Sequence, residues 1–153
     1  MRSKSRKVEI LRDVALFGLC TRKELNDIAG LVDELSVKQG DALTTEGTPG
    51  RECFVVVSGE AEATVRGKRI ATIGAGECVG EMALLDTAPR TATVTALTDM
   101  ELLVLEPRSF GDLLDRHPSV AKRLLATLAR RLREASDSPA YTHWAYAARD
   151  AVA

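Results

Sequence analysis

The stretch from Gly80 to Val94 reads GEMALLDTAPRTATV and predicts a short helical turn followed by a strand. In the run TATVTA, residues 91–96, apolar and hydroxyl side chains alternate, as they do in a strand that is buried on one face. By this alternation Arg90 lies on the apolar face. A guanidinium turned toward a core is costly unless an anion meets it. Either a carboxylate of the protein or a bound ligand must therefore neutralise Arg90.

The residues before Arg90 favour a ligand. Gly80 to Leu85 reads as one helical turn after a glycine, and the first N–H groups of such a turn have no partners within it. These donors attract anions, and the planar fork of an arginine suits phosphate oxygens. Glu81 would repel a phosphate but suits a neighbouring hydroxyl, such as a ribose 2′-OH. The pattern predicts a site for a phosphate joined to a sugar, with an internal Arg–Glu pair as the alternative.

The same segment resembles the phosphate-binding cassette of cyclic nucleotide-binding domains. That cassette reads Gly-Glu, an apolar residue, Ala-Leu, a few loop residues, Pro-Arg, then Ala, Ser or Thr, then Ala, and each position is matched between Gly80 and Ala92. The resemblance extends from about residue 8 to about residue 135. It implies a β-roll flanked by helices that binds a 3′,5′-cyclic nucleotide. Val79 departs from the pattern, because the family usually has Phe there.

The resemblance also implies a role for each cassette residue. Glu81 would bind the ribose 2′-OH, and Arg90 would pair with the cyclic phosphate. Further ligand contacts are expected from Val79, Gly80, Met82, Ala83, Thr91 and Ala92, with Leu84 as an additional backbone contact. Cyclic AMP is the favoured ligand. Cyclic GMP is the alternative, because the Thr91 hydroxyl could reach a guanine amino group as well as the phosphate.

Length and composition fit one globular domain. The chain has 153 residues, of which 45% are hydrophobic and 28% are charged. A net charge of −1 provides no general basic field for nucleic acid, and no apolar run is long enough to span a bilayer. The basic N-terminus MRSKSRK is not followed by an apolar segment, which argues against a secretory signal. We therefore predict a cytoplasmic protein without membrane or direct nucleic-acid partners.

Neither a metal site nor a catalytic site is expected. Cys20, Cys53 and Cys78 form no C-x-x-C pair, which argues against a disulfide framework, a zinc site or an iron–sulfur cluster. His117 and His143 both lie beyond the strand region, so they cannot form the histidine set of a cupin-type metal site. No nucleophile-elbow signature is present. The sequence thus predicts a binding protein with no cofactor and no enzymatic activity.

Around the cassette, the sequence predicts helices at both ends of a run of short strands. A flexible basic tail at residues 1–7 would precede an amphipathic helix from Val8 to Phe17. Thr21-Arg-Lys-Glu24 is expected to be a capping box that opens a second helix. From Leu31 to Leu105, turn residues separate about eight short strands, as in a roll, barrel or sandwich. One two-residue hairpin turn is expected at Gly67-Lys68.

After Pro107 the pattern becomes helical again, with an apolar stripe along a longer helix from Val120 to Leu132. The resemblance implies that this helix closes over the bound base as a lid. The base would be capped by one cationic or aromatic side chain, the candidates being Arg130, Arg131, Arg133, Trp144, Tyr141 and Tyr146. The expected domain therefore spans residues 8–135, and residues 136–153 are a tail or a short helix.

These expectations favour a stand-alone cyclic nucleotide sensor that signals to an unidentified effector protein by movement of its C-terminal helix. Met1 and a tail before the first helix are what a complete small protein would show. The alternative is a truncated transcription regulator of the catabolite-activator type, since Leu128 to Arg133 resembles the dimer helix of that group. A cyclic GMP-binding regulatory module is a further alternative. A degenerate domain that keeps the fold for protein interaction only is another, but the intact Glu81 and Arg90 argue against it.

Overall fold

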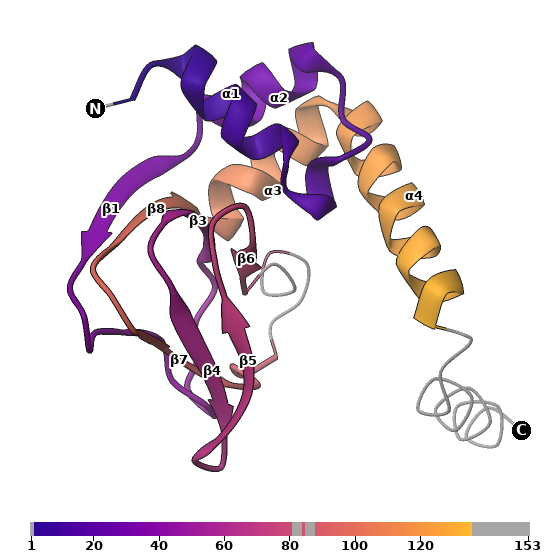
Figure 1. Ribbon diagram of the computed structural model, residues 1–153. Helices are drawn as coiled ribbons and strands as arrows, with labels where there is room; N and C mark the ends of the chain where they lie inside the picture. The colour runs from indigo at the N-terminus through magenta and orange to yellow at the C-terminus, as the bar shows by residue number, and fades with distance from the viewer. Residues whose placement is uncertain (1, 81–83, 85–87, 136–153) are drawn as a thin grey trace, which may run out of the picture.

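The computed structural model describes residues 2–80, 84 and 88–135. Within these residues the chain forms two antiparallel sheets of four strands each, with helices before and after them (Figure 1). This confirms the predicted fold: a mainly β roll with N-terminal helices and a C-terminal helix. The short cassette helix expected after Gly80 lies outside the described residues.

Each sheet brings together strands that are distant in sequence. The first sheet has the order β1 (Asp33–Val37), β8 (Met100–Leu105), β3 (Cys53–Ser58) and β6 (Cys78–Val79). The second has the order β2 (Ala42–Thr44), β7 (Thr93–Ala96), β4 (Ala61–Val65) and β5 (Lys68–Ile73). The helices are α1 (Lys4–Arg12), the 3₁₀ turn η1 (Ala15–Phe17), α2 (Arg22–Ala29), α3 (Pro107–Arg116) and α4 (Pro118–Ala135).

Two hydrophobic clusters share the first sheet. One cluster packs the helices against the sheet and includes Phe17 and Phe110, whose rings meet edge to face with centroids 6.3 Å apart. The other cluster fills the space between the two sheets. Because side chains alternate along a strand, β3 contributes Val55 to the helical cluster and Phe54 and Val56 to the cluster inside the roll.

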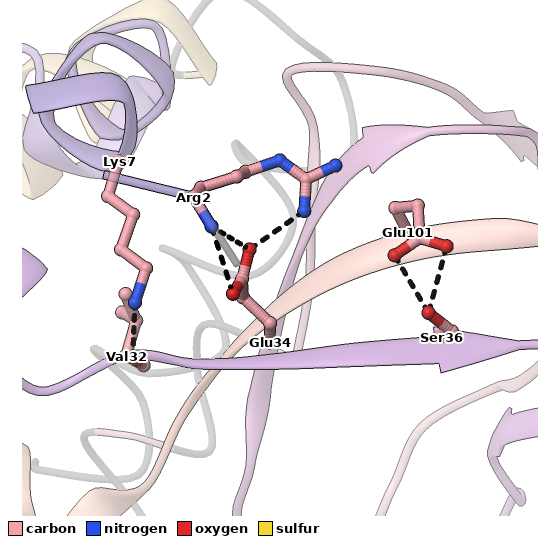
Figure 2. Close-up of polar contacts among 6 residues, drawn as sticks. All are labelled: Arg2, Lys7, Val32, Glu34, Ser36 and Glu101. Carbon is pink, nitrogen blue, oxygen red and sulfur yellow. Dashed lines mark hydrogen bonds and ion pairs between the residues drawn. The ribbon is translucent and has the colours of Figure 1, made fainter. Parts of the chain in front are cut away.

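The N-terminal segment is ordered by capping and by contacts with β1. Ser3 caps α1 by accepting a hydrogen bond from the Arg6 N–H at 3.2 Å. Figure 2 shows Arg2 donating to the Glu34 carboxylate from its main-chain nitrogen and from Nη1, both at 2.9 Å, and Lys7 donating to the Val32 carbonyl. The expected flexible tail at residues 1–7 is therefore corrected, since α1 already begins at Lys4.

The helix expected from Val8 to Phe17 is also corrected, because it ends early and is followed by η1. Asp13 is the C-cap of α1, and Val14 takes an extended conformation with φ −75° and ψ 124°. This extended residue interrupts the helical backbone. The apolar side chains of both pieces still reach one core, so the spacing alone concealed the break.

The hairpin between β4 and β5 turns one residue earlier than expected. Its central residues are Arg66 and Gly67, with φ values of +52° and +77°, and not Gly67 and Lys68. A two-residue turn with both φ values positive suits the twist of a hairpin and favours glycine at its second position. The Glu46 carboxylate accepts a hydrogen bond from the Arg66 N–H at 2.9 Å, which supports this strained conformation.

The predicted capping box of α2 is confirmed and also anchors α4. The Glu24 N–H donates to Thr21 Oγ1 at 3.2 Å, and the Thr21 N–H donates to Glu24 Oε1 at 2.7 Å. Arg123 of α4 brings its Nε within 3.2 Å of Glu24 Oε1. Burial alone would raise the pKa of this carboxyl, but the hydrogen bonds from Thr21 and Ser119, together with Arg123, outweigh it and lower the pKa.

Candidate functional site

Arg90 is fixed by its backbone at the entrance to β7. Its N–H donates to the Thr48 carbonyl at 3.0 Å, and its carbonyl accepts from the Gly47 N–H at 2.8 Å. Its side chain is 7% exposed. Val94 and Ala96, on the same face by alternation, are buried inside the roll. The prediction that the guanidinium points toward the apolar side is therefore confirmed.

The guanidinium of Arg90 is only partly satisfied by the protein. Its Nη2 donates to the main-chain carbonyl of Glu52 at 2.8 Å, and the Glu52 carboxylate lies 3.6 Å from the same nitrogen. That distance is too long for a hydrogen bond, and the Glu52 side chain is 49% exposed. Within the described part of the chain, the buried Nη1 has no hydrogen-bond partner. The predicted alternative, an internal Arg–Glu pair, is therefore present only as one long ion pair that leaves Nη1 without a hydrogen bond to the described residues.

Two glycines allow this arginine to lie against the backbone. A Cβ on Gly50 would lie 2.5 Å from Arg90 Nε, and a Cβ on Gly80 would overlap Nη1. Gly80 also has a φ of +80°, a conformation that other residues rarely adopt. A side chain at either position would therefore displace the Arg90 guanidinium, and at Gly80 it would also be strained by the backbone conformation.

A cavity of about 170 Å³ opens beside the guanidinium. Five predicted site residues line it, namely Val79, Gly80, Arg90, Thr91 and Ala92. Four residues that the sequence did not single out also line it, namely Thr44, Ile73, Cys78 and Val94. The volume is below the roughly 300–1,000 Å³ of pockets that enclose a drug-sized ligand. It would therefore enclose only part of a nucleotide.

The four missed residues reach the cavity through the fold. Thr44 of β2 stands opposite Val94 of β7, and its hydroxyl donates to the Ala92 carbonyl at 3.0 Å. Ile73 ends β5, which reaches β7 only through β4. Strand pairing of this kind leaves no local signal in the sequence. Val94 could have been predicted as a residue of the site, because in the alternating pattern it lies on the same face as Arg90 and Ala92.

Several predicted site residues cannot be placed at the cavity. Glu81, Met82 and Ala83 lie outside the described residues, as do Trp144, Tyr141, Tyr146 and the side chain of Arg131. The side chain of Leu84 packs into the helical cluster, so it does not face the cavity. Arg130 and Arg133 are exposed on α4, do not line the cavity, and belong to a helix that packs on η1 and α3. Figure 1 shows α4 running beside the strands and not over them.

Other features of the described residues offer less chemistry. A larger hollow of about 550 Å³ lies between α1 and β3, lined by Arg6, Glu9 and Asp13 among others, but its charged groups are at the surface and none is a buried cation without a partner. No three His, Cys, Asp or Glu side chains of the described residues are grouped so as to hold a metal ion. None of the helices in this part of the chain has the length and apolar character needed to cross a membrane.

Comparisons with known proteins point to one family. The family model of the cyclic nucleotide-binding domain matches residues 34–117. The cyclic AMP receptor protein of Thermus thermophilus is 41% identical over an alignment of 102 residues that covers 63% of this chain and 47% of that protein. The chain spans 39%, 28% and 47% of the lengths of three curated relatives, including this one.

Solved structures show the same likeness. The N-terminal domain of a transcriptional regulator from Streptomyces coelicolor has a TM-score of 0.77 and 35% identity, covering 84% of this chain and 93% of that one. The regulatory domain of Toxoplasma gondii PKA, crystallised with cAMP, has a TM-score of 0.66 and 32% identity, covering 72% and 44% respectively. At these identities the likeness extends beyond the fold to the sequence.

Proposed function

The chain belongs to the cyclic nucleotide-binding domain family, and on this basis we propose that it is a non-catalytic sensor that binds a 3′,5′-cyclic nucleotide at Arg90. One observation carries the proposal: Arg90 Nη1 is buried beside a cavity and has no partner in the described residues. A buried charged donor left without an acceptor costs at least about 1–3 kcal/mol. A cyclic phosphate in the cavity would supply that acceptor and remove the cost.

The resemblance assigns the remaining contacts. Glu81 would accept a hydrogen bond from the ribose 2′-OH, and the backbone from Gly80 to Ala83 would contribute further ligand contacts. Thr91 would lie against the phosphate from the side of β7, where it lines the cavity. Cyclic AMP is the favoured ligand, because the T. thermophilus relative is named a cyclic AMP receptor and the T. gondii domain was crystallised with cAMP.

Signalling would follow from movement of α4. A ligand shifts a conformational equilibrium only by its differential affinity for the two states, so the nucleotide must bind better when α4 is closed over it. Arg130, Arg131, Arg133 or Trp144 would then cap the base from this helix or from the segment after it. The output would be passed to an effector protein.

A second candidate function is a transcription regulator of the catabolite-activator type of which this chain is one part. It is favoured by the likeness to the N-terminal domain of the S. coelicolor regulator. Gel-shift and sedimentation measurements on the whole protein that contains this chain separate the two functions, because such a regulator would be a dimer that retards duplex DNA. A sensor acting through a protein effector would leave the DNA unretarded.

The central test is calorimetric titration with cyclic AMP and cyclic GMP on the wild type, Arg90→Ala and Arg69→Ala. Each lost charge-assisted hydrogen bond of about 1.5–3 kcal/mol corresponds to an affinity loss of about 10- to 150-fold. We expect at least this loss in Arg90→Ala. Arg69 is the control, because it is an exposed arginine of β5 that pairs with Glu62. Unchanged affinity in a folded Arg90→Ala variant would refute the site.

A further inference from the structure

We propose that Glu52 sets the charge selectivity of the Arg90 site, so that it accepts singly charged phosphodiesters and rejects doubly charged phosphomonoesters. This inference rests on the proposed function, because it concerns the same anion site. It identifies a specificity-determining residue outside the cassette. Glu52 directly precedes β3, so the start of a buried strand fixes its backbone next to the guanidinium.

Glu52 contacts Arg90 in two different ways. Its main-chain carbonyl accepts a hydrogen bond from Nη2 at 2.8 Å, which orients the guanidinium and leaves Nη1 free for a ligand. Its carboxylate, at 3.6 Å from Nη2, makes no hydrogen bond and acts only through its charge. Among the described residues, no other carboxylate forms an ion pair with Arg90. The main-chain carbonyl of Glu52 therefore orients the guanidinium, and its carboxylate supplies the negative charge, so a substitution can remove the charge without the hydrogen bond.

The charges predict the selectivity. Arg90 and Glu52 together are formally neutral. The site therefore attracts an anion through the buried Nη1, which has no hydrogen-bond partner among the described residues, and repels excess negative charge through the Glu52 carboxylate. A cyclic phosphodiester carries one negative charge. A phosphomonoester such as 5′-AMP carries between about 1.5 and 2 negative charges at neutral pH, since its second pKa is near 6. Its additional charge would face the Glu52 carboxylate, which lies 3.6 Å from Arg90 Nη2.

The size of the effect follows from Coulomb's law. For a separation taken as about 7 Å, the dielectric constant of bulk water, about 80, gives the lower limit of the effect, at which one pair of like charges weakens binding about threefold. Removing the Glu52 charge should therefore tighten binding at least about threefold for a singly charged ligand and at least about sevenfold for a doubly charged one. The preference for cyclic AMP over 5′-AMP should narrow about threefold. The narrowing should shrink at high salt, because the Debye length falls from about 10 Å at 0.1 M to about 3 Å at 1 M.

The experiment is titration of the wild type, Glu52→Gln and Glu60→Gln with cyclic AMP and with 5′-AMP, at low and high salt. Glu52→Gln keeps the main-chain acceptor and the side-chain shape and removes only the charge. Glu60→Gln removes one exposed carboxylate at the other end of β7, where the Glu60 carbonyl accepts from the Leu97 N–H. We expect the narrowed preference in Glu52→Gln alone.

Each other outcome overturns a specific statement. If the wild type binds cyclic AMP but Glu52→Gln keeps the wild-type preference, the inference fails and the proposed function stands. If Glu52→Gln weakens both ligands, the carboxylate acts by positioning Arg90, and the inference also fails. If Glu60→Gln narrows the preference equally, the effect comes from net charge and not from Glu52. If the wild type binds neither ligand, the proposed function and the inference fail together.

Discussion

Gly80→Ala should damage the site and the fold by different amounts, and Gly76→Ala provides a matched control. Both glycines have positive φ values, +80° for Gly80 and +87° for Gly76. A Cβ at Gly76 would meet no atom within 4 Å, whereas a Cβ at Gly80 would overlap Arg90 Nη1 and lie 3.0 Å from the Glu52 carbonyl. The two variants therefore share the backbone strain, and only Gly80→Ala displaces the guanidinium.

The magnitudes follow from these contacts. Left-handed backbone costs a non-glycine residue about 1–2 kcal/mol, so both variants should lose about this much unfolding free energy. Displacing Arg90 also breaks its hydrogen bond to the Glu52 carbonyl, which adds up to about 1.5–3 kcal/mol because the donor is charged. Gly80→Ala should thus be the less stable variant. Its affinity for cyclic AMP should fall at least about tenfold, while that of Gly76→Ala stays near the wild-type value.

Urea denaturation measures the two stability losses, and calorimetry at a temperature where both variants are folded measures the affinities. Equal stability losses together with equal affinities would show that Gly80 has no steric relation to Arg90. Loss of binding in both variants would show that backbone strain alone disturbs the cavity. Either result would refute the steric argument.

Two further predictions concern the helical layer. The pKa of Glu24 is lower in the folded protein than its ordinary value of 4.5. Its ionised carboxylate therefore stabilises the fold fully at pH values above 4.5, and this stabilisation is lost as the pH falls through the pKa of the folded state. Glu24→Gln should therefore be less stable by about 1–2 kcal/mol at pH 7, and the difference should vanish in acid, as urea titrations from pH 7 to pH 2.5 would reveal; a constant difference would contradict this. Phe110→Ala should lose about 3–5 kcal/mol in urea denaturation, because Phe110 is fully buried against Phe17; a loss below 1 kcal/mol would contradict that packing.

The sequence predicted those parts of the fold and site that depend on local chemistry. The Thr21 and Glu24 capping box needs only a spacing of three residues, and it formed as expected. The burial of Arg90 was also predicted correctly, but β7 begins only at Thr93, so hydrogen bonds to Gly47 and Thr48, and not strand alternation, hold the Arg90 backbone in place. Turn positions were less certain, because Gly67 suits either central position of a hairpin turn and only strand register decides between them.

The remaining features depend on contacts between distant residues. Glu52 and Arg90 are 38 positions apart, and no periodicity relates the loop before β3 to the loop before β7. Arg2 and Glu34 are 32 positions apart, so the sequence around Arg2 does not indicate that this residue contacts β1. Each contact forms because a sheet or a helix brings the two residues together. Neither residue has a local sequence pattern from which its partner could be predicted.

Strand β3 separates the two hydrophobic clusters, because one of its faces packs on the helices and the other faces the inside of the roll. A larger side chain at Val55 would press on the helices, whereas one at Phe54 would press on the interior of the roll. Strand β6 pairs with β3 at these two residues and leads directly to Gly80. A displacement of β3 caused by the helices would therefore also move the edge of the Arg90 cavity. We therefore expect the helices and the cavity to respond to one another, and Cys78, which packs against the helical cluster and lines the cavity, joins the two directly.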